Sequence, residues 1–233
     1  IIAPSFYTIH NDIKKKAHTH YWLKGGRGST KSSFISIEIV KGIMNDAQQG
    51  VMSNAVIFRR VKETLADSVR DQIKWAIDVL EVSDYWHVPE AKLTITYKPT
   101  GQVIRFKGAD NPKKAKSTKV PKGWVKYIWY EEVDEFESYA KIRNINQSLM
   151  RGGPDFIVFY SFNPPDSQRN WVNRHVLEPR QDTLVHHSTY QTVPREWLGE
   201  PFIIEAEHLK KTKLEKYNHE YLGEVIGTGG EVF

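Results

Sequence analysis

A glycine-rich segment between a predicted strand and a predicted helix most restricts how this chain can fold. Residues 25–33 read GGRGSTKSS, after the apolar run of residues 21–23 and before the apolar positions of residues 33–44. Small residues let backbone N–H groups curl around phosphate oxygens, and a following helix adds the positive end of its dipole. This order of elements predicts a nucleotide phosphate site. A glycine turn that binds nothing is the alternative.

The segment matches the pattern G-x-x-x-x-G-K-[ST] except at its second glycine, which is Thr30. Lys31 is expected to place its charge on the β- and γ-phosphates, and the Ser32 hydroxyl to bind Mg²⁺. Because Thr30 is β-branched, we expect a negative φ there. Arg27 is predicted to stabilise charge on the γ-phosphate. The residues predicted to bind the nucleotide are Gly25, Gly26, Arg27, Gly28, Ser29, Thr30, Lys31, Ser32, Ser33 and Arg59.

Two adjacent acids follow a second apolar run, residues 127–130. The carboxyl end of a buried strand is where an open α/β sheet builds its site. We therefore predict that Glu131 binds Mg²⁺ and that Glu132 is the catalytic base that accepts a proton from the attacking water. The alternative is that these acids, with Asp134 and Glu135, only mark the N-terminus of a helix, where the dipole favours negative charge.

A third apolar run, residues 156–160, ends in a pair of polar residues. Ser161 and Asn163 are predicted to sense the γ-phosphate and to couple its loss to movement. A plain Asn–Pro turn is the alternative. Arg143 and Arg151 remain candidates for an arginine that acts on the nucleotide of a neighbouring subunit.

Basic residues suggest a polyanionic partner. The net charge is +5, and residues 111–126 hold six lysines that we expect in an exposed loop. With Trp124 nearby, this loop could contact a phosphate backbone, or it could serve only solubility. Arg59 ends the predicted strand 54–59 and could face the nucleotide base, a neighbouring subunit or DNA.

Strands and helices alternate along the chain, which predicts an α/β fold with a mainly parallel sheet covered by helices on both faces. The chain has no cysteine, which excludes disulfides and Cys-ligated zinc, and no apolar run approaches the ~18 residues of a membrane span. We expect a core in residues 1–170, whose first 18 residues pack with a lid, and a lid or linker in residues 171–233. The predicted strands are 21–23, 54–59, 93–97, 102–106, 125–130 and 156–160, and the predicted helices are 33–44, 61–80, 139–150, 171–178 and 205–221.

The motifs GGRGSTKSS, VIFRR, FKGADNPKKAKS, YIWYEEVDEF and FYSFNPP occur in this order, and together they resemble the N-terminal ATPase domain of tailed-phage terminase large subunits over roughly residues 18–230. The resemblance implies a RecA-like ASCE P-loop NTPase that uses Mg²⁺ and ATP to drive double-stranded DNA into a procapsid. It implies portal protein and terminase small subunit as partners, and a location in the host-cell cytoplasm. A ring of five copies is implied, with a monomer as the alternative for the isolated fragment.

The resemblance also carries roles onto single positions. It implies that residues 25–32 bind ATP, that Glu131 binds Mg²⁺ and that Glu132 is the catalytic carboxylate. Ser161 and Asn163 match the strand end that couples hydrolysis to movement. The family's subunits continue into a C-terminal nuclease domain, which we expect beyond this chain, so no nuclease activity is expected here.

Three other functions share part of this pattern. A RecA-like helicase or translocase unrelated to packaging would have the same loop and acids. A small-molecule kinase would lack an acid dedicated to water, and a non-catalytic nucleotide-binding scaffold would not need Glu132.

Overall fold

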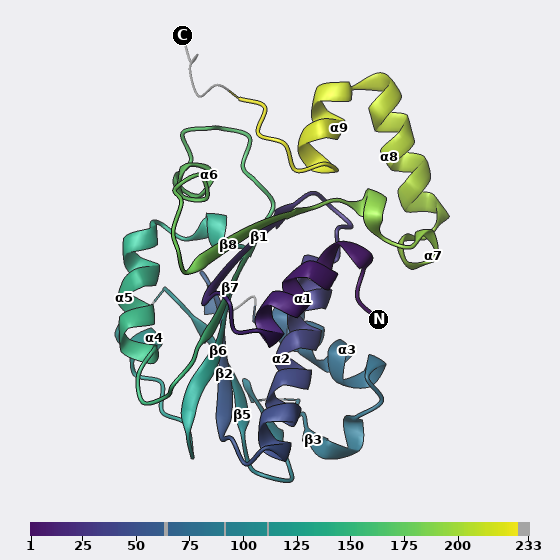
Figure 1. Ribbon diagram of the computed structural model, residues 1–233. Coiled ribbons are helices and arrows are strands. Elements are labelled where there is room, and N and C mark those ends of the chain that lie inside the picture. The colour runs from purple at the N-terminus through teal and green to yellow at the C-terminus, as the bar shows by residue number, and fades with distance from the viewer. Residues whose placement is uncertain (63–64, 91, 111, 228–233) are drawn as a thin grey trace.

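The computed structural model describes residues 1–62, 65–90, 92–110 and 112–227 (Figure 1). Its centre is an eight-stranded sheet with the strand order β3-β4-β5-β2-β6-β7-β1-β8. The strands are β1 His20–Gly25, β2 Ser53–Arg59, β3 Trp86–His87, β4 Thr94–Tyr97, β5 Val103–Gly108, β6 Trp124–Glu131, β7 Ile157–Phe162 and β8 Thr183–Ser188.

The sheet is mainly parallel, as predicted. β2 pairs in parallel with β5 and β6, and β7 pairs in parallel with β6 and β1. In the described part of the chain, the antiparallel pairs are β3–β4 and β4–β5. β8 was not predicted, and it pairs in parallel with β1 from Thr183 to Ser188. Its histidines give it no continuous apolar run. Because β8 lies within residues 171–233, part of the expected lid segment is in the sheet; the division at residue 170 stays a prediction.

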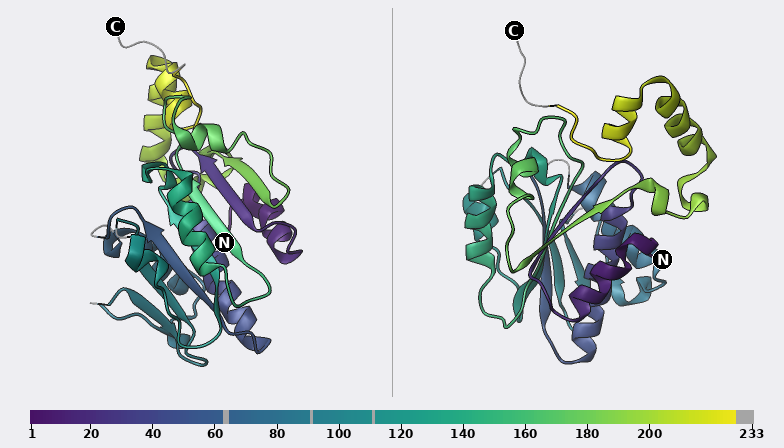
Figure 2. Two further views of the ribbon diagram at one scale, coloured as in Figure 1. Left: turned by 90° about the vertical axis from the view of Figure 1, so that its left-hand side faces the viewer. Right: turned by 45° about the horizontal axis from the view of Figure 1, so that its top comes forward.

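Helices cover both faces of the sheet (Figures 1 and 2). α1, α2 and α3 lie on one face, and α4, α5 and α6 lie on the other. The C-terminal helices, α7 to α9, form a separate group beside one end of the sheet. The helices are α1 Tyr7–Lys14, α2 Lys31–Gln48, α3 Asp71–Val79, α4 Pro112–Lys116, α5 Tyr139–Leu149, α6 Trp171–His175, α7 Arg195–Leu198, α8 Glu200–Thr212 and α9 Leu214–Glu220.

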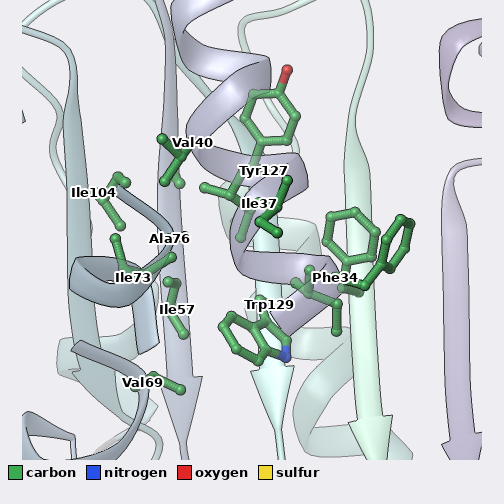
Figure 3. Packing of buried hydrophobic residues seen from close by; sticks show 14 of the residues in the cluster. Phe34, Ile37, Val40, Ile57, Val69, Ile73, Ala76, Ile104, Tyr127 and Trp129 are labelled. Atoms are coloured by element: carbon green, nitrogen blue, oxygen red, sulfur yellow. The ribbon is translucent and has the colours of Figure 1, made fainter. Parts of the chain in front are cut away.

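Strand residues alternate between two hydrophobic cores because successive side chains point to opposite faces. On the α2 side, Ile57 and Trp129 are fully buried with Phe34 of α2 (Figure 3). On the α5 side, Phe58 and Tyr130 are fully buried. Burial of each large side chain contributes roughly 1.5–3 kcal/mol, so the first residues of α2 are fixed on the sheet.

Two predicted helices differ from the structure. The expected helix 61–80 is a π-helix, Ala66–Arg70, followed by α3, while residues 63–64 lie outside the described residues. The expected helix 205–221 is two helices, α8 and α9, because Lys213 between them has the non-helical dihedral angles φ −146° and ψ 69°. The predicted linker residues 228–230 also lie outside the described part of the chain.

The lysine-rich segment is not entirely the exposed loop that we expected. Residue 111 lies outside the described residues, but α4 begins at the next residue, and the segment ends inside β6. Lys126 is buried in β6, where its Nζ contacts Asp46 at 2.9 Å and Asp155 at 3.6 Å. Pairing with carboxylates that are distant in sequence offsets part of the cost of burying this charge.

Within the described residues, no helix has the length and apolar character that a bilayer crossing requires.

A buried hydrogen-bonded network joins α5 to the sheet. Tyr130 donates its hydroxyl to Asn146 Oδ1 at 2.7 Å, and Asn146 Nδ2 donates to the Tyr160 hydroxyl at 2.9 Å. The network continues to His20, whose Nδ1 lies 2.8 Å from the Tyr160 oxygen. Burial lowers the pKa of His20 to about 4, so this imidazole is neutral near pH 7.

His20 should make the folded protein sensitive to acid. Its pKa is about 4 in the folded state and 6.5 unfolded, so the unfolded chain takes up the proton first as the pH falls. The group therefore destabilises the fold by about 3 kcal/mol between pH 7 and pH 4. Urea unfolding across this range should show a smaller loss in His20→Gln than in the native protein. His208→Gln, at an exposed position of α8, is the control, and parallel curves for native and His20→Gln would contradict the assignment.

Candidate functional site

A polar cavity of about 250 Å³ lies where the loop after β1 meets the carboxyl ends of β6 and β7. The parallel register places Ser161 opposite both Glu131 and Leu23, so the three strands end in one row. The cavity therefore brings together residues from all three motifs of the sequence. Its lining residues are Lys31, Ser32, Glu131, Glu132, Asp134, Glu135, Ser161, Phe162 and Asn163.

Lys31 lies at the centre of the hydrogen bonding in this site. Its Nζ donates to the Gly25 and Gly26 carbonyl oxygens at 3.1 and 3.3 Å and to Ser29 Oγ at 2.9 Å. It also donates to Asn163 Oδ1 at 2.8 Å. These acceptors carry no full charge, so burial lowers the pKa of Lys31 to about 7, against a smaller opposing effect of Asp134. An anionic ligand would supply the missing negative charge.

The φ angle of Thr30 is positive, so the expected negative φ was wrong. Thr30 has φ +62° and ψ 25°, in the left-handed region, immediately before α2. Glycine occupies this position of the pattern, and the loop keeps the geometry that glycine favours although a β-branched residue stands there. The Thr30 hydroxyl is also buried without a hydrogen-bond partner among the described residues. The turn into α2 therefore holds Thr30 in a strained conformation.

Glu131 and Ser32 fit the prediction of a Mg²⁺ site. Ser32 and Glu131 both line the polar cavity, and Oε2 of Glu131 is buried without a hydrogen-bond partner among the described residues. Burial raises the pKa of Glu131, and the charge of Arg59 opposes this rise. Mg²⁺ commonly takes one or two protein oxygens beside phosphate oxygens and water, which suits this small donor set. No group of three or more His, Asp or Glu side chains in the described chain could hold a metal ion by itself.

Arg59 lies beside the acids rather than on the phosphate loop. Its Nε is 3.4 Å from Glu131 Oε2, and its terminal nitrogen forms an ion pair with Glu132. Glu132 has φ +49° and ψ 53°, and its side chain is 48% exposed. The left-handed turn directs the chain away from β6 directly after Glu131. The Glu131 side chain is thus largely buried in the site, and the Glu132 carboxylate faces solvent.

The end of β7 touches the phosphate loop directly. Asn163 accepts a hydrogen bond from Lys31, as described above, and Ser161 Oγ accepts one from Trp129 Nε1 at 2.8 Å. Side-chain hydrogen bonds therefore connect Ser161 to β6 and Asn163 to the phosphate loop. These contacts agree with the predicted sensing position, although a role in coupling stays a prediction.

Arg27 does not lie where we expected a γ-phosphate contact. Its side chain is exposed, and it does not line the polar cavity. Its backbone N–H donates to the Glu220 carbonyl oxygen at 2.8 Å, at the end of α9. The C-terminal helices therefore pack on the loop, and a Cβ at Gly26 would collide with the backbone carbonyl of Tyr221. Gly28 is similarly close to the Phe202 ring of α8.

A second cavity, of about 590 Å³, lies on the other side of the loop. Thr30 and Ser33 line it, so this cavity lies against the start of α2. Two half-exposed indoles, Trp75 of α3 and Trp197 of α7, also line it, together with Phe34. This cavity could not be predicted from the sequence because its lining residues come from distant elements.

Asp134 and Glu135 also line the polar cavity, although they were considered only as alternatives to a site. The 3₁₀ turn Val133–Glu135 folds them back toward β6. Burial raises the pKa of Asp134 to about 6. The run of acids after residue 130 was the available signal, but only the turn places them.

The chain is similar to terminase large subunits of phages, both in a family model and in a curated relative. A family model described as phage terminase large subunit matches residues 17–224. The terminase large subunit of Bacillus phage SPP1 is 39% identical over 97% of this chain, which covers 54% of that protein. The chain thus spans about half the length of this relative.

Solved structures with the same fold include two phage large terminases. A large terminase of a thermophilic bacteriophage, in complex with ADP, matches with a TM-score of 0.69 at 13% identity, covering 97% of this chain and 54% of that one. An ATPase-domain variant of the large terminase of Thermus phage P74-26 matches with a TM-score of 0.64 at 14% identity, covering 93% of this chain and 92% of that one.

Replacing Thr30 with glycine should stabilise the protein. The substitution removes a left-handed β-branched residue and a buried, unpaired hydroxyl, and we expect a gain of about 1 kcal/mol in the free energy of unfolding. Chemical denaturation measures this change. Thr189→Gly is the matched control because Thr189 has φ −130°, so glycine should destabilise there. A loss of stability in both variants would show that Thr30 is not strained.

Proposed function

The chain belongs to the phage terminase large subunit family, and we propose that it is the ATP-hydrolysing motor part of such a subunit. The observation that carries this proposal is the polar cavity, which joins Lys31 and Ser32 to Glu131, Glu132 and Asn163. The RecA-like ASCE fold is the one that its structural relatives share. The ADP complex of one relative supports nucleotide use.

Lys31 and Glu132 would perform the central steps. On binding ATP, Lys31 would exchange neutral oxygen acceptors for phosphate oxygens, and the new charge would favour its protonated form. Glu132, exposed at the mouth of the cavity, would orient water for in-line attack and accept its proton. Arg59 must then release Glu132, since it now forms an ion pair with that carboxylate. Arg27 would need to turn inward to reach the γ-phosphate.

The Ser32 hydroxyl and the Glu131 carboxylate would hold Mg²⁺. When bound, the ion would neutralise negative charge on the phosphates. The raised pKa of Glu131 reflects its burial, and a cation beside it would favour the ionised form.

The second cavity, which Trp75 and Trp197 line beside the phosphate loop, would bind the nucleotide base. Ser33 lines this cavity and directly follows Ser32 of the polar cavity, and the indoles of Trp75 and Trp197 provide flat apolar surfaces. Base–aromatic stacking contributes about 1–3 kcal/mol per base. The nucleoside and phosphate ends of ATP would then lie on opposite sides of the start of α2.

Membership of the family supports a wider role for the whole subunit. We propose that the whole subunit uses this ATPase to move double-stranded DNA into a procapsid in the host-cell cytoplasm, with portal protein and terminase small subunit as partners. A ring of five copies would assemble on the portal. A C-terminal nuclease domain would be a separate part of the whole subunit.

Glu132→Gln tests the catalytic base. The variant keeps the shape of the side chain but cannot accept the proton, so phosphate release from ATP should fall at least ~100-fold. ADP affinity, measured by calorimetry, should stay close to the native value. Glu137→Gln, at an exposed carboxylate outside the cavity, is the control. Unchanged turnover in Glu132→Gln would remove this residue from the role.

Trp75→Ala tests whether the second cavity binds the nucleotide base. Loss of the indole should weaken ADP binding about tenfold or more while inorganic triphosphate binds as before. Competition titrations with the two ligands measure the difference. If both ligands lose affinity equally, the indole supports the loop rather than the base.

A further inference from the structure

The face formed by α4 and α5 concentrates positive charge away from the nucleotide site. The two helices pack together on the side of the sheet opposite α2 (Figures 1 and 2). Residues 112–130 and 139–154 contain no aspartate or glutamate. The exposed basic side chains that these segments contribute include Lys113, Lys116, Lys119, Lys122, Arg143 and Arg151.

A hollow of about 430 Å³ lies over the last turns of α5. Arg143 and Gln147, four residues apart, line it from one side of the helix. Arg151 follows the end of α5, and its Nε donates to the Gln147 carbonyl oxygen at 2.8 Å, which holds it beside the helix. Arg180 reaches the same hollow from the loop before β8, held by the Tyr139 hydroxyl at 3.0 Å.

The charge in the hollow is not balanced locally. Among the described residues, neither Arg143 nor Arg151 forms an ion pair, and Asp182 near the hollow is paired with Arg180 at 3.1 Å. Below the hollow, the hydrogen bonds of Asn146 fix α5 on the sheet. The guanidinium groups are therefore presented from a fixed helix. Guanidinium and amide donors suit phosphate oxygens.

We propose that this hollow, together with the exposed lysines of the α4 segment, which packs against α5, contacts the sugar–phosphate backbone of duplex DNA. The assignment rests on the proposed function and names the surface through which the motor would touch its track. Each four residues of α-helix rise about 6 Å, and each DNA strand carries a phosphate every ~3.4 Å along the axis. The stretch of chain from Arg143 to Arg151 is thus long enough to reach several neighbouring phosphates.

The same face is poorly suited to single strands. Single-strand binding relies on aromatic rings that stack on bases. Within the described residues 112–154, no large hydrophobic side chain is strongly exposed, and Tyr139 is stacked on His175 with ring centroids 4.0 Å apart. Backbone contact without stacking or base readout predicts binding that is independent of sequence and strongly dependent on salt.

The test is the binding of a short labelled duplex of arbitrary sequence by this chain, followed by fluorescence anisotropy without ATP over a series of salt concentrations. The double variant Arg143→Gln/Arg151→Gln should bind at least ~10-fold more weakly at low salt, with a log–log salt slope shallower by about 2. Lys211→Gln/Lys213→Gln changes the net charge equally at exposed positions near the end of α8 and should bind like the native chain.

The outcomes separate the DNA surface from the ATPase proposal. Loss of duplex affinity with basal ATP hydrolysis retained supports the surface, whatever Glu132→Gln shows for catalysis. Loss of basal hydrolysis at unchanged duplex affinity overturns it and places the arginines at a neighbour's nucleotide. An equal loss in both double variants, no duplex binding by the native chain, or equally good competition by a single strand of the same length would also overturn it.

Discussion

The buried ammonium group of Lys31 is the contact on which the site depends. It joins two carbonyl groups of the phosphate loop to the amide of Asn163 at the end of β7. A cation in this position, without a carboxylate bonded to it, is costly in the interior and favours an anionic ligand. The protein can hold it because the loop and strand converge on one point. Loop geometry and strand end are therefore coupled through a single side chain.

That convergence comes from the parallel sheet. β7 lies between β1 and β6, so its last residues sit between the phosphate loop and the two acids. Large apolar side chains on both faces fix the three strands in register. A shift by one residue would move each side chain to the opposite face. The acids and the lysine would then no longer share a cavity.

The elements of the site could be predicted where the signal is local. The strand–loop–helix around residues 20–48 and the strands before Glu131 and Ser161 follow from contiguous patterns, and the comparisons confirm the family and the fold. Features that depend on distant residues could not be predicted: the edge strand β8 has a mixed pattern, and Arg59 meets the acids only through strand pairing. The prediction of a negative φ at Thr30 was wrong because the geometry of the turn overrides the preference of its side chain.

The packing of the C-terminal helices on the phosphate loop restricts which sequences the loop can accept. A Cβ at Gly26 would meet the backbone of Tyr221, directly after α9, and one at Gly25 would meet the backbone of Ser188, at the end of the neighbouring strand β8. Neither neighbour is a flexible side chain that could rotate aside. The requirement for glycine at these two positions is therefore imposed by the protein's own backbone, independently of any phosphate. A relative that lost nucleotide binding but kept β8 and the C-terminal helices would therefore still need both glycines, so these two positions reflect the packing of the fold, whereas Lys31 and Ser32 reflect the chemistry of the site.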